Sequence, residues 1–180
     1  DVERLLGACD ATTVGGLRDH AMMLLMARLG LRNGDVARLR LSDISWADAT
    51  FSVRGKGRRL VRMPLPQEVG DGVLRWITGG RPDCDDDHVF LRLRAPYGPL
   101  GTPAINNVVV RAAKRAALDV PGVGPHLLRH SVATTLVNEG VSLPAIGALL
   151  RHQSLDTTII YAKVDASLLG SIARPWPTEV

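Results

Sequence analysis

Apolar residues recur at the spacing of an α-helix along most of this chain, and glycine or proline marks the ends of the helical stretches. Residues 17–29 show this spacing and stop at Gly30, and Pro125 opens another stretch that Gly140 closes. We expect further helices over residues 33–39 with Asn33 as the cap, over 66–78, 103–118 and 142–150, and a last short helix that Ser154 caps and that carries Tyr161.

One segment changes to the alternation of a β-strand. Residues 50–53 alternate between two faces, and residues 60–63 can pair with them because Gly55-Lys56-Gly57 provides a turn. We expect an acidic loop over residues 79–88 and a further short strand over 89–91. The sequence therefore predicts an α+β fold that is mainly helical, with one small antiparallel sheet near the amino end.

Length and composition favour one globular domain. The 180 residues suit a single domain, and 46% hydrophobic with 22% charged residues is the balance of a folded chain. No apolar run approaches the roughly 20 residues of a membrane span, so we expect no membrane partner. Cys9 and Cys84 are too few for a disulfide framework, which fits a reducing cytoplasm. The chain begins at Asp1 with no Met, and we interpret it as a fragment of a longer protein.

Positive charge is concentrated in the predicted hairpin. The net charge of +4 is only mildly basic, but residues 52–63 contain no acid and five basic side chains: Arg54, Lys56, Arg58, Arg59 and Arg62. A cluster of one sign suits a polyanion such as DNA. A solvated hairpin has the same composition, so the charge pattern alone leaves both interpretations open.

Three short clusters contain side chains suited to phosphate chemistry. Arg32 lies between two predicted helices, a corner from which a cation can point into a cleft. His126 and Arg129 are three residues apart, so they share one face of a helix whose first turn offers free N–H groups to a phosphate. His152 is in a turn, and Tyr161 lies on the next helix. Taken singly, each of these residues is explained as well by a structural role.

The order of these residues resembles the signature of the tyrosine recombinase (phage integrase) family. Leu29-Gly30-Leu31-Arg32 is similar to the family's first box, and His126-Leu127-Leu128-Arg129-His130-Ser131 to its second. His152-Gln153-Ser154 followed by Tyr161 completes the set, so the resemblance spans nearly the whole chain. It implies that residues 1–180 form a catalytic domain and that the family's amino-terminal DNA-clamping domain is absent from this chain.

The resemblance implies a site-specific recombinase or integrase that cleaves and rejoins double-stranded DNA through a covalent 3′-phosphotyrosine, with no metal or other cofactor. It implies a tetramer on DNA, linked through the tail after Tyr161, and it allows for accessory DNA-bending or directionality proteins. It also implies a cytoplasmic location, at the nucleoid when the protein is bound to DNA.

Such a transfer needs a nucleophile, charge relief on the non-bridging oxygens and an acid for the leaving oxygen. A tyrosine phenol is mostly neutral near pH 7, because its reference pKa is about 10, so it needs a base. The resemblance implies Tyr161 as nucleophile, His126 as general base, Lys56 as general acid, Arg32 and Arg129 as planar forks on the phosphate oxygens, and His152 as a further hydrogen-bond donor. We expect additional DNA contacts from Arg54, Arg58, Arg59 and Arg151.

Three positions depart from the family's pattern. Arg151 replaces a small residue, commonly glycine, and could add a phosphate contact or alter the turn that aims His152. Asp35 stands where the family usually has Glu, and we expect the shorter carboxylate to brace the site from behind. Thr135 replaces a frequent His at a position that we expect to be structural.

Several other functions were weighed against this one. His126 and His130 are four apart on a helix, as zinc ligands can be, but Leu127 replaces the glutamate of the zinc-protease motif, and Arg129 would repel a cation. The acidic stretch 83–88 is better explained as a loop than as a metal site. Two alternatives stay open, a type IB topoisomerase-like relative with the same nucleophile and a non-catalytic DNA-binding relative.

Overall fold

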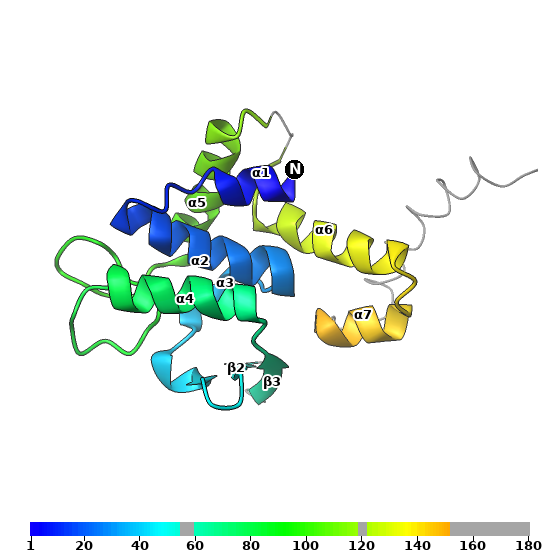
Figure 1. The fold of residues 1–180 in the computed structure, drawn as a ribbon, viewed down its shortest axis with the longest axis horizontal. Coiled ribbons are helices and arrows are strands. Elements are labelled where there is room, and N and C mark those ends of the chain that lie inside the picture. The colour runs from blue at the N-terminus through cyan, green and yellow to red at the C-terminus, as the bar shows by residue number, and fades with distance from the viewer. Residues whose placement is uncertain (55–59, 119–121, 152–180) are drawn as a thin grey trace, which may run out of the picture. The chain divides into compact units, whose positions relative to one another are not determined.

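The computed structural model describes residues 1–54, 60–118 and 122–151, which belong to two compact units, Asp1–Val132 and Ala133–Val180 (Figure 1). The first unit contains α1 (Val2–Gly7), α2 (Val14–Leu29), α3 (Asn33–Arg38), a 3-10 turn (Leu41–Asp43), β1 (Ile44–Ser45), β2 (Thr50–Arg54), β3 (Leu60–Pro64), α4 (Gln67–Gly79), α5 (Thr102–Arg115) and the start of α6 (Pro125–Asn138). The second unit contains the rest of α6 and α7 (Leu143–Leu149). Among these helices, none is long and apolar enough to cross a lipid bilayer.

Helix α2 forms the centre of the first unit. Its residues 22–26 have no exposed surface. A helical stretch that is apolar all round, as residues 21–27 are, must be covered on every side, and α1, α3, α4 and α5 all contact α2. Helix α4 runs alongside α2 (Figure 1). Gly72 permits this close approach, because a Cβ there would lie 2.4 Å from Cδ1 of Leu24.

Both ends of α2 are set by local hydrogen bonds. The Thr13 hydroxyl accepts a bond of 3.0 Å from the Gly16 N–H, so the helix begins three residues earlier than the apolar spacing predicts. Gly30 ends the helix as predicted, in the left-handed region with φ 59°. The N–H groups of Gly30 and Leu31 both return to the carbonyl of Leu25, which satisfies the helix end.

The start of α3 differs from the prediction. Asn33 was predicted as the cap, and this is wrong: Arg32 holds the cap position with extended backbone, and Asn33 is the first helical residue. The Asn33 side chain instead accepts a bond of 2.8 Å from the Gly34 N–H and donates one of 2.9 Å to Asn106 on α5. The start of α3 is thereby tied to the first turns of α5.

The predicted antiparallel hairpin is confirmed, within a sheet of order β1-β2-β3. Phe51 pairs with Met63 and Val53 with Val61, and the alternate residues Phe51, Val53 and Met63 are buried. The two-residue strand β1 was not predicted. The strand expected over residues 89–91 is wrong, because only isolated bridges form there, Arg40 with His88 and Leu91 with Pro99.

The second unit confirms two predicted helix boundaries. Gly140 follows α6 with φ 77°, a left-handed conformation that glycine adopts without strain. Ser142 holds the cap position of α7, which ends before Leu150. Across the described residues the fold is mainly helical with one small antiparallel sheet, as the sequence predicts.

Candidate active site

The corner between α2 and α3 presents Arg32. The left-handed Gly30 turns the chain out of α2, and Arg32 follows with φ −72° and ψ 147°. Its carbonyl accepts the N–H groups of Asp35 and Val36 at 2.9 and 3.1 Å, which starts α3. The Arg32 side chain is exposed. The corner therefore presents a cation, as the sequence predicts.

Arg129, which is distant in sequence, lies at this same corner. It lies on α6, is only 8% exposed, and its Nη1 donates a hydrogen bond to the Gly30 carbonyl oxygen. The two residues are 99 positions apart in sequence. This bond joins the second predicted cluster to the first. His126, one turn earlier on the same helix, is exposed.

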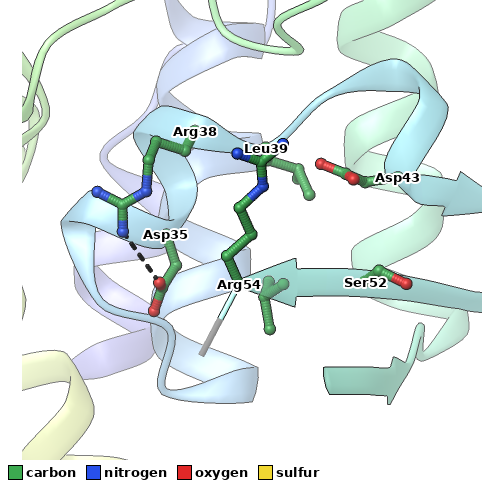
Figure 2. A pocket seen from close by; sticks show the side chains of 7 residues that line it. Asp35, Arg38, Leu39, Asp43, Ser52 and Arg54 are labelled. Atoms are coloured by element: carbon green, nitrogen blue, oxygen red, sulfur yellow. Dashed lines mark hydrogen bonds and ion pairs between the residues drawn. The ribbon is translucent and has the colours of Figure 1, made fainter. Parts of the chain in front are cut away.

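Asp35 lies just beyond the corner and is buried. Its Oδ1 is 3.4 Å from Nη2 of Arg38, whose side chain is 60% exposed. Figure 2 shows this pair beside a small, open pocket, which Asp35, Arg38, Leu39, Asp43, Ser52, Val53 and Arg54 line. The Asp35 carboxylate thus pairs with Arg38, and the bracing role expected for Asp35 stays a prediction.

The hairpin brings Arg54 to this pocket. Arg54 is exposed at the end of β2 and pairs with Leu60 at the start of β3. Arg62 differs from Arg54, because its guanidinium bonds to Asp48 and to the Thr50 hydroxyl. Residues 52–63 contain no acid, but in the folded chain the Asp48 carboxylate bonds to Arg62. The cluster is therefore free of acids along the sequence and not in three dimensions.

Several predicted site residues lie outside the described residues: Lys56, Arg58, Arg59, His152 and Tyr161. Arg151 is the last described residue of the second unit. Its φ is 53°, in the left-handed region that favours glycine. The backbone there therefore has the conformation for which a glycine, common at this position in the family, is suited.

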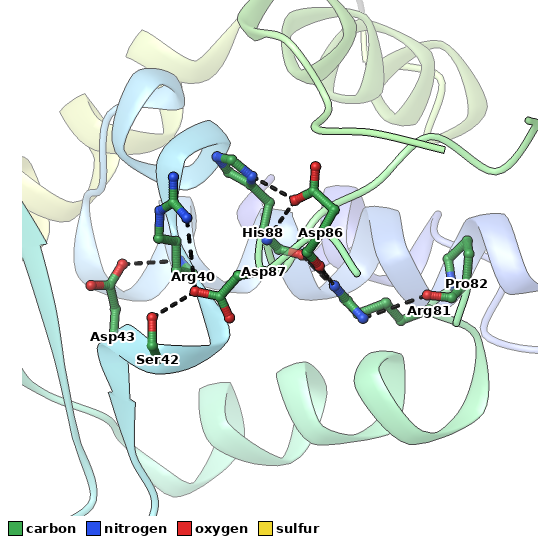
Figure 3. Close-up of polar contacts among 8 residues, drawn as sticks. All are labelled: Arg40, Ser42, Asp43, Arg81, Pro82, Asp86, Asp87 and His88. Atoms are coloured by element: carbon green, nitrogen blue, oxygen red, sulfur yellow. Dashed lines mark hydrogen bonds and ion pairs between the residues drawn. The ribbon is translucent and has the colours of Figure 1, made fainter. Parts of the chain in front are cut away.

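Sequence reasoning missed a polar network that ties the acidic loop to the segment following α3 (Figure 3). The Ser42 hydroxyl donates a bond of 2.6 Å to Asp87, and Nη1 of Arg40 lies 3.9 Å from the same carboxylate. The His88 N–H donates a bond of 2.8 Å to Asp86, and bonds from His88 lower the pKa of the Asp86 carboxyl. Asp87 therefore holds the loop against the segment that leads to β1, while Asp86 stabilises the turn of the loop itself.

A second missed network is buried beneath α5. The Arg18 guanidinium lies 2.9 Å from Asp19 and donates to the Leu91 carbonyl at 3.2 Å, and both of these charged residues are buried. Nη2 of Arg111 on α5 lies 3.4 Å from the other Asp19 oxygen. Buried charges are stable only when paired, so this network links α2, α5 and the loop before α5.

Comparison with protein families matches residues 1–167 to the model of the phage integrase family. The putative integrase/recombinase y4rA of Sinorhizobium fredii is 43% identical over 180 residues, which cover 99% of this chain and 44% of that protein. The tyrosine recombinase XerC of Oceanobacillus iheyensis is 35% identical, with 78% of this chain and 47% of XerC covered. The chain thus spans less than half the length of either relative.

Solved structures share the fold. The crystal structure of XerA recombinase superposes with a TM-score of 0.77 at 24% identity, covering 97% of this chain and 64% of that one. XerH site-specific recombinase, bound to its palindromic difH substrate in a post-cleavage complex, gives a TM-score of 0.76 at 22% identity, with 95% and 50% covered.

Proposed function

The chain belongs to the phage integrase family, and on that premise we propose that it is the catalytic domain of a site-specific recombinase that cleaves and rejoins double-stranded DNA through Tyr161. The observation that carries this proposal is the hydrogen bond from Arg129 to the Gly30 carbonyl. It puts one predicted phosphate-binding arginine at the corner that presents the other, Arg32. Two guanidinium groups that act on one phosphate suit the charge that develops on it in the transition state.

Each bond and proton of the proposed reaction is accounted for, and the reaction needs no external energy source. The phenol oxygen of Tyr161 attacks the phosphorus while His126 takes the phenol proton. The bond to the 5′ oxygen breaks, and Lys56 supplies the proton that this oxygen needs. Arg32 and Arg129 hold the non-bridging oxygens, as a metal does in other phosphoryl-transfer enzymes.

The phosphotyrosine that results preserves the energy of the broken bond, so the reverse steps rejoin a strand. His152 adds a hydrogen bond to the phosphate in this scheme. Arg54, Arg58, Arg59 and Arg151 contact the DNA backbone, and Asp35 supports the corner from behind.

The assembly proposed for the whole protein follows the same premise. XerH is described in complex with its difH substrate before and after cleavage, and we extend a double-stranded DNA partner to this chain. Residues 1–180 act as the catalytic domain in the cytoplasm, and four copies assemble on DNA through the tail after Tyr161.

A randomised library of nicked duplexes tests the proposal and supplies the unknown target. The protein is incubated with the library, and DNA that stays attached on a denaturing gel is sequenced. We expect covalent complexes with a common sequence, and strand exchange between two plasmids that carry it. Relaxation of supercoils without exchange would instead identify a type IB topoisomerase-like enzyme, and binding without attachment a non-catalytic relative.

A further inference from the structure

The carbonyl of Gly30 lies at the end of α2 and takes no part in the hydrogen bonds of that helix end. The N–H groups of Gly30 and Leu31 both donate to the carbonyl oxygen of Leu25, and these hydrogen bonds end α2. With φ 59° and ψ 28°, Gly30 turns its own carbonyl out of the helical ladder. That carbonyl accepts the hydrogen bond from Nη1 of Arg129.

The surroundings of this bond are tightly packed. Gly30 and Arg129 are both buried, and Leu29 and Leu31 on either side of the glycine are 5% and 1% exposed. A guanidinium is a planar fork, so a bond to one terminal nitrogen restricts the direction of the whole group. The orientation of Arg129 therefore depends on the backbone direction at Gly30.

Arg32 depends on the same turn. It lies two residues after Gly30, and its extended backbone and α3-capping carbonyl fix where its side chain leaves the chain. One backbone conformation thus sets the starting geometry of both arginines.

We propose that Gly30 is a positioning residue for DNA cleavage, whose left-handed conformation aims Arg129 and directs Arg32 toward a common phosphate. This inference rests on the proposed function, since it assigns a task to the same two arginines. Gly30 itself touches no DNA in the scheme.

The requirement for glycine follows from the sign of φ. An L side chain disfavours φ near +60°, and asparagine tolerates it better than alanine does. A Cβ at residue 30 drives the corner toward negative φ, which swings the carbonyl away from Arg129. A displacement of about 1 Å in a catalytic group can cost on the order of a hundredfold in rate.

The test compares Gly30→Ala and Gly30→Asn with the matched control Gly140→Ala in the complete protein. Gly140 also has a positive φ, 77°, and a Cβ there meets no atom within 4 Å. Gly140→Ala therefore incurs the same backbone cost without disturbing either arginine. The substrate is the nicked duplex that the wild-type protein attacks, and the readouts are Kd for that duplex, single-turnover cleavage at saturating DNA, and the urea midpoint.

We expect both alanine variants to lose stability, but only Gly30→Ala to lose cleavage, on the order of tenfold or more, with Kd close to that of the wild type. Gly30→Asn is expected to cleave at an intermediate rate, and it decides the question if Gly30→Ala does not fold. Wild-type cleavage by either folded Gly30 variant, or an equal loss in Gly140→Ala, overturns the inference. A wild-type protein that never attaches to DNA overturns the proposed function instead.

Discussion

Replacing Arg129 by alanine perturbs stability and chemistry together, and the structure allows both effects to be estimated. The side chain is 8% exposed, and its bond partner, the Gly30 carbonyl, is buried. A buried carbonyl that loses its donor costs about 1–3 kcal/mol, so the free energy of unfolding is expected to fall by about that amount. Removal of one preorganised donor to a transition state costs about 10²–10³ in rate, which is the expected loss of cleavage.

The two effects are separated by their assays and by a matched control. Urea unfolding reports stability, and single-turnover cleavage of the nicked duplex, at a temperature where the variant is folded, reports chemistry. Arg111→Ala also removes a guanidinium, but Arg111 is 52% exposed and its ion pair with Asp19 is 3.4 Å long. Asp19 is buried but keeps its partner Arg18 when the half-exposed Arg111 is removed, so this control is expected to stay folded and to cleave normally.

Arg129→Lys keeps the charge but loses the planar fork, since an ammonium is a point charge. Its cleavage rate is expected to lie between those of the wild type and Arg129→Ala. An Arg129→Ala protein that cleaves at the wild-type rate would refute the assignment of this arginine. Unchanged stability would show that the bond to Gly30 does not form in solution.

Charged side chains also determine three further measurable outcomes. Asp19→Ala leaves the buried Arg18 without its carboxylate, so urea unfolding should show that the free energy of unfolding falls by about 3–5 kcal/mol. A fall below about 1 kcal/mol contradicts the buried pair. Arg54→Gln should reduce the slope of log K against log salt for DNA binding by about 0.9. Arg62→Gln should reduce this slope by less, because Arg62 already bonds to Asp48. Equal slopes for the two variants would count against Arg54 as a phosphate contact. Cleavage should persist in EDTA, since guanidinium groups take the place of a metal, and activity that returns only with added zinc or magnesium contradicts this.

The helices and the hairpin were predictable because their signals are local. Gly30 and Gly140 end helices through their own backbone freedom, and the alternation in residues 50–53 is visible without any partner. Helix α1 and strand β1 were missed because six and two residues are too few to show a period. Residues 89–91 have strand-like composition, but the bridges there involve only Leu91 among them, so composition alone misled.

The site was predictable in its residue types but not in its contacts. The resemblance indicated Arg32 and Arg129 as partners, yet nothing in their spacing shows that Arg129 bonds to Gly30. The pairing of Arg62 with Asp48 is hidden in the same way, because the turn between β1 and β2 brings the acid across to the hairpin. Such contacts depend on tertiary packing, which periodicity does not encode.

The identity of the nucleophile is the central claim, and the chain offers a matched control for it. Only two tyrosines are present, Tyr161 and Tyr97, and Tyr97 is 47% exposed in the loop before α5. The measurement is digestion of the covalent complex with the nicked duplex, followed by mass spectrometry of the nucleotide-linked peptide, for the wild type, Tyr161→Phe and Tyr97→Phe. We predict a 3′-phosphotyrosine at Tyr161 in the wild type and in Tyr97→Phe, and no covalent complex in Tyr161→Phe although it binds DNA normally. A covalent complex formed by Tyr161→Phe, or a modified peptide that lacks Tyr161, would contradict this assignment.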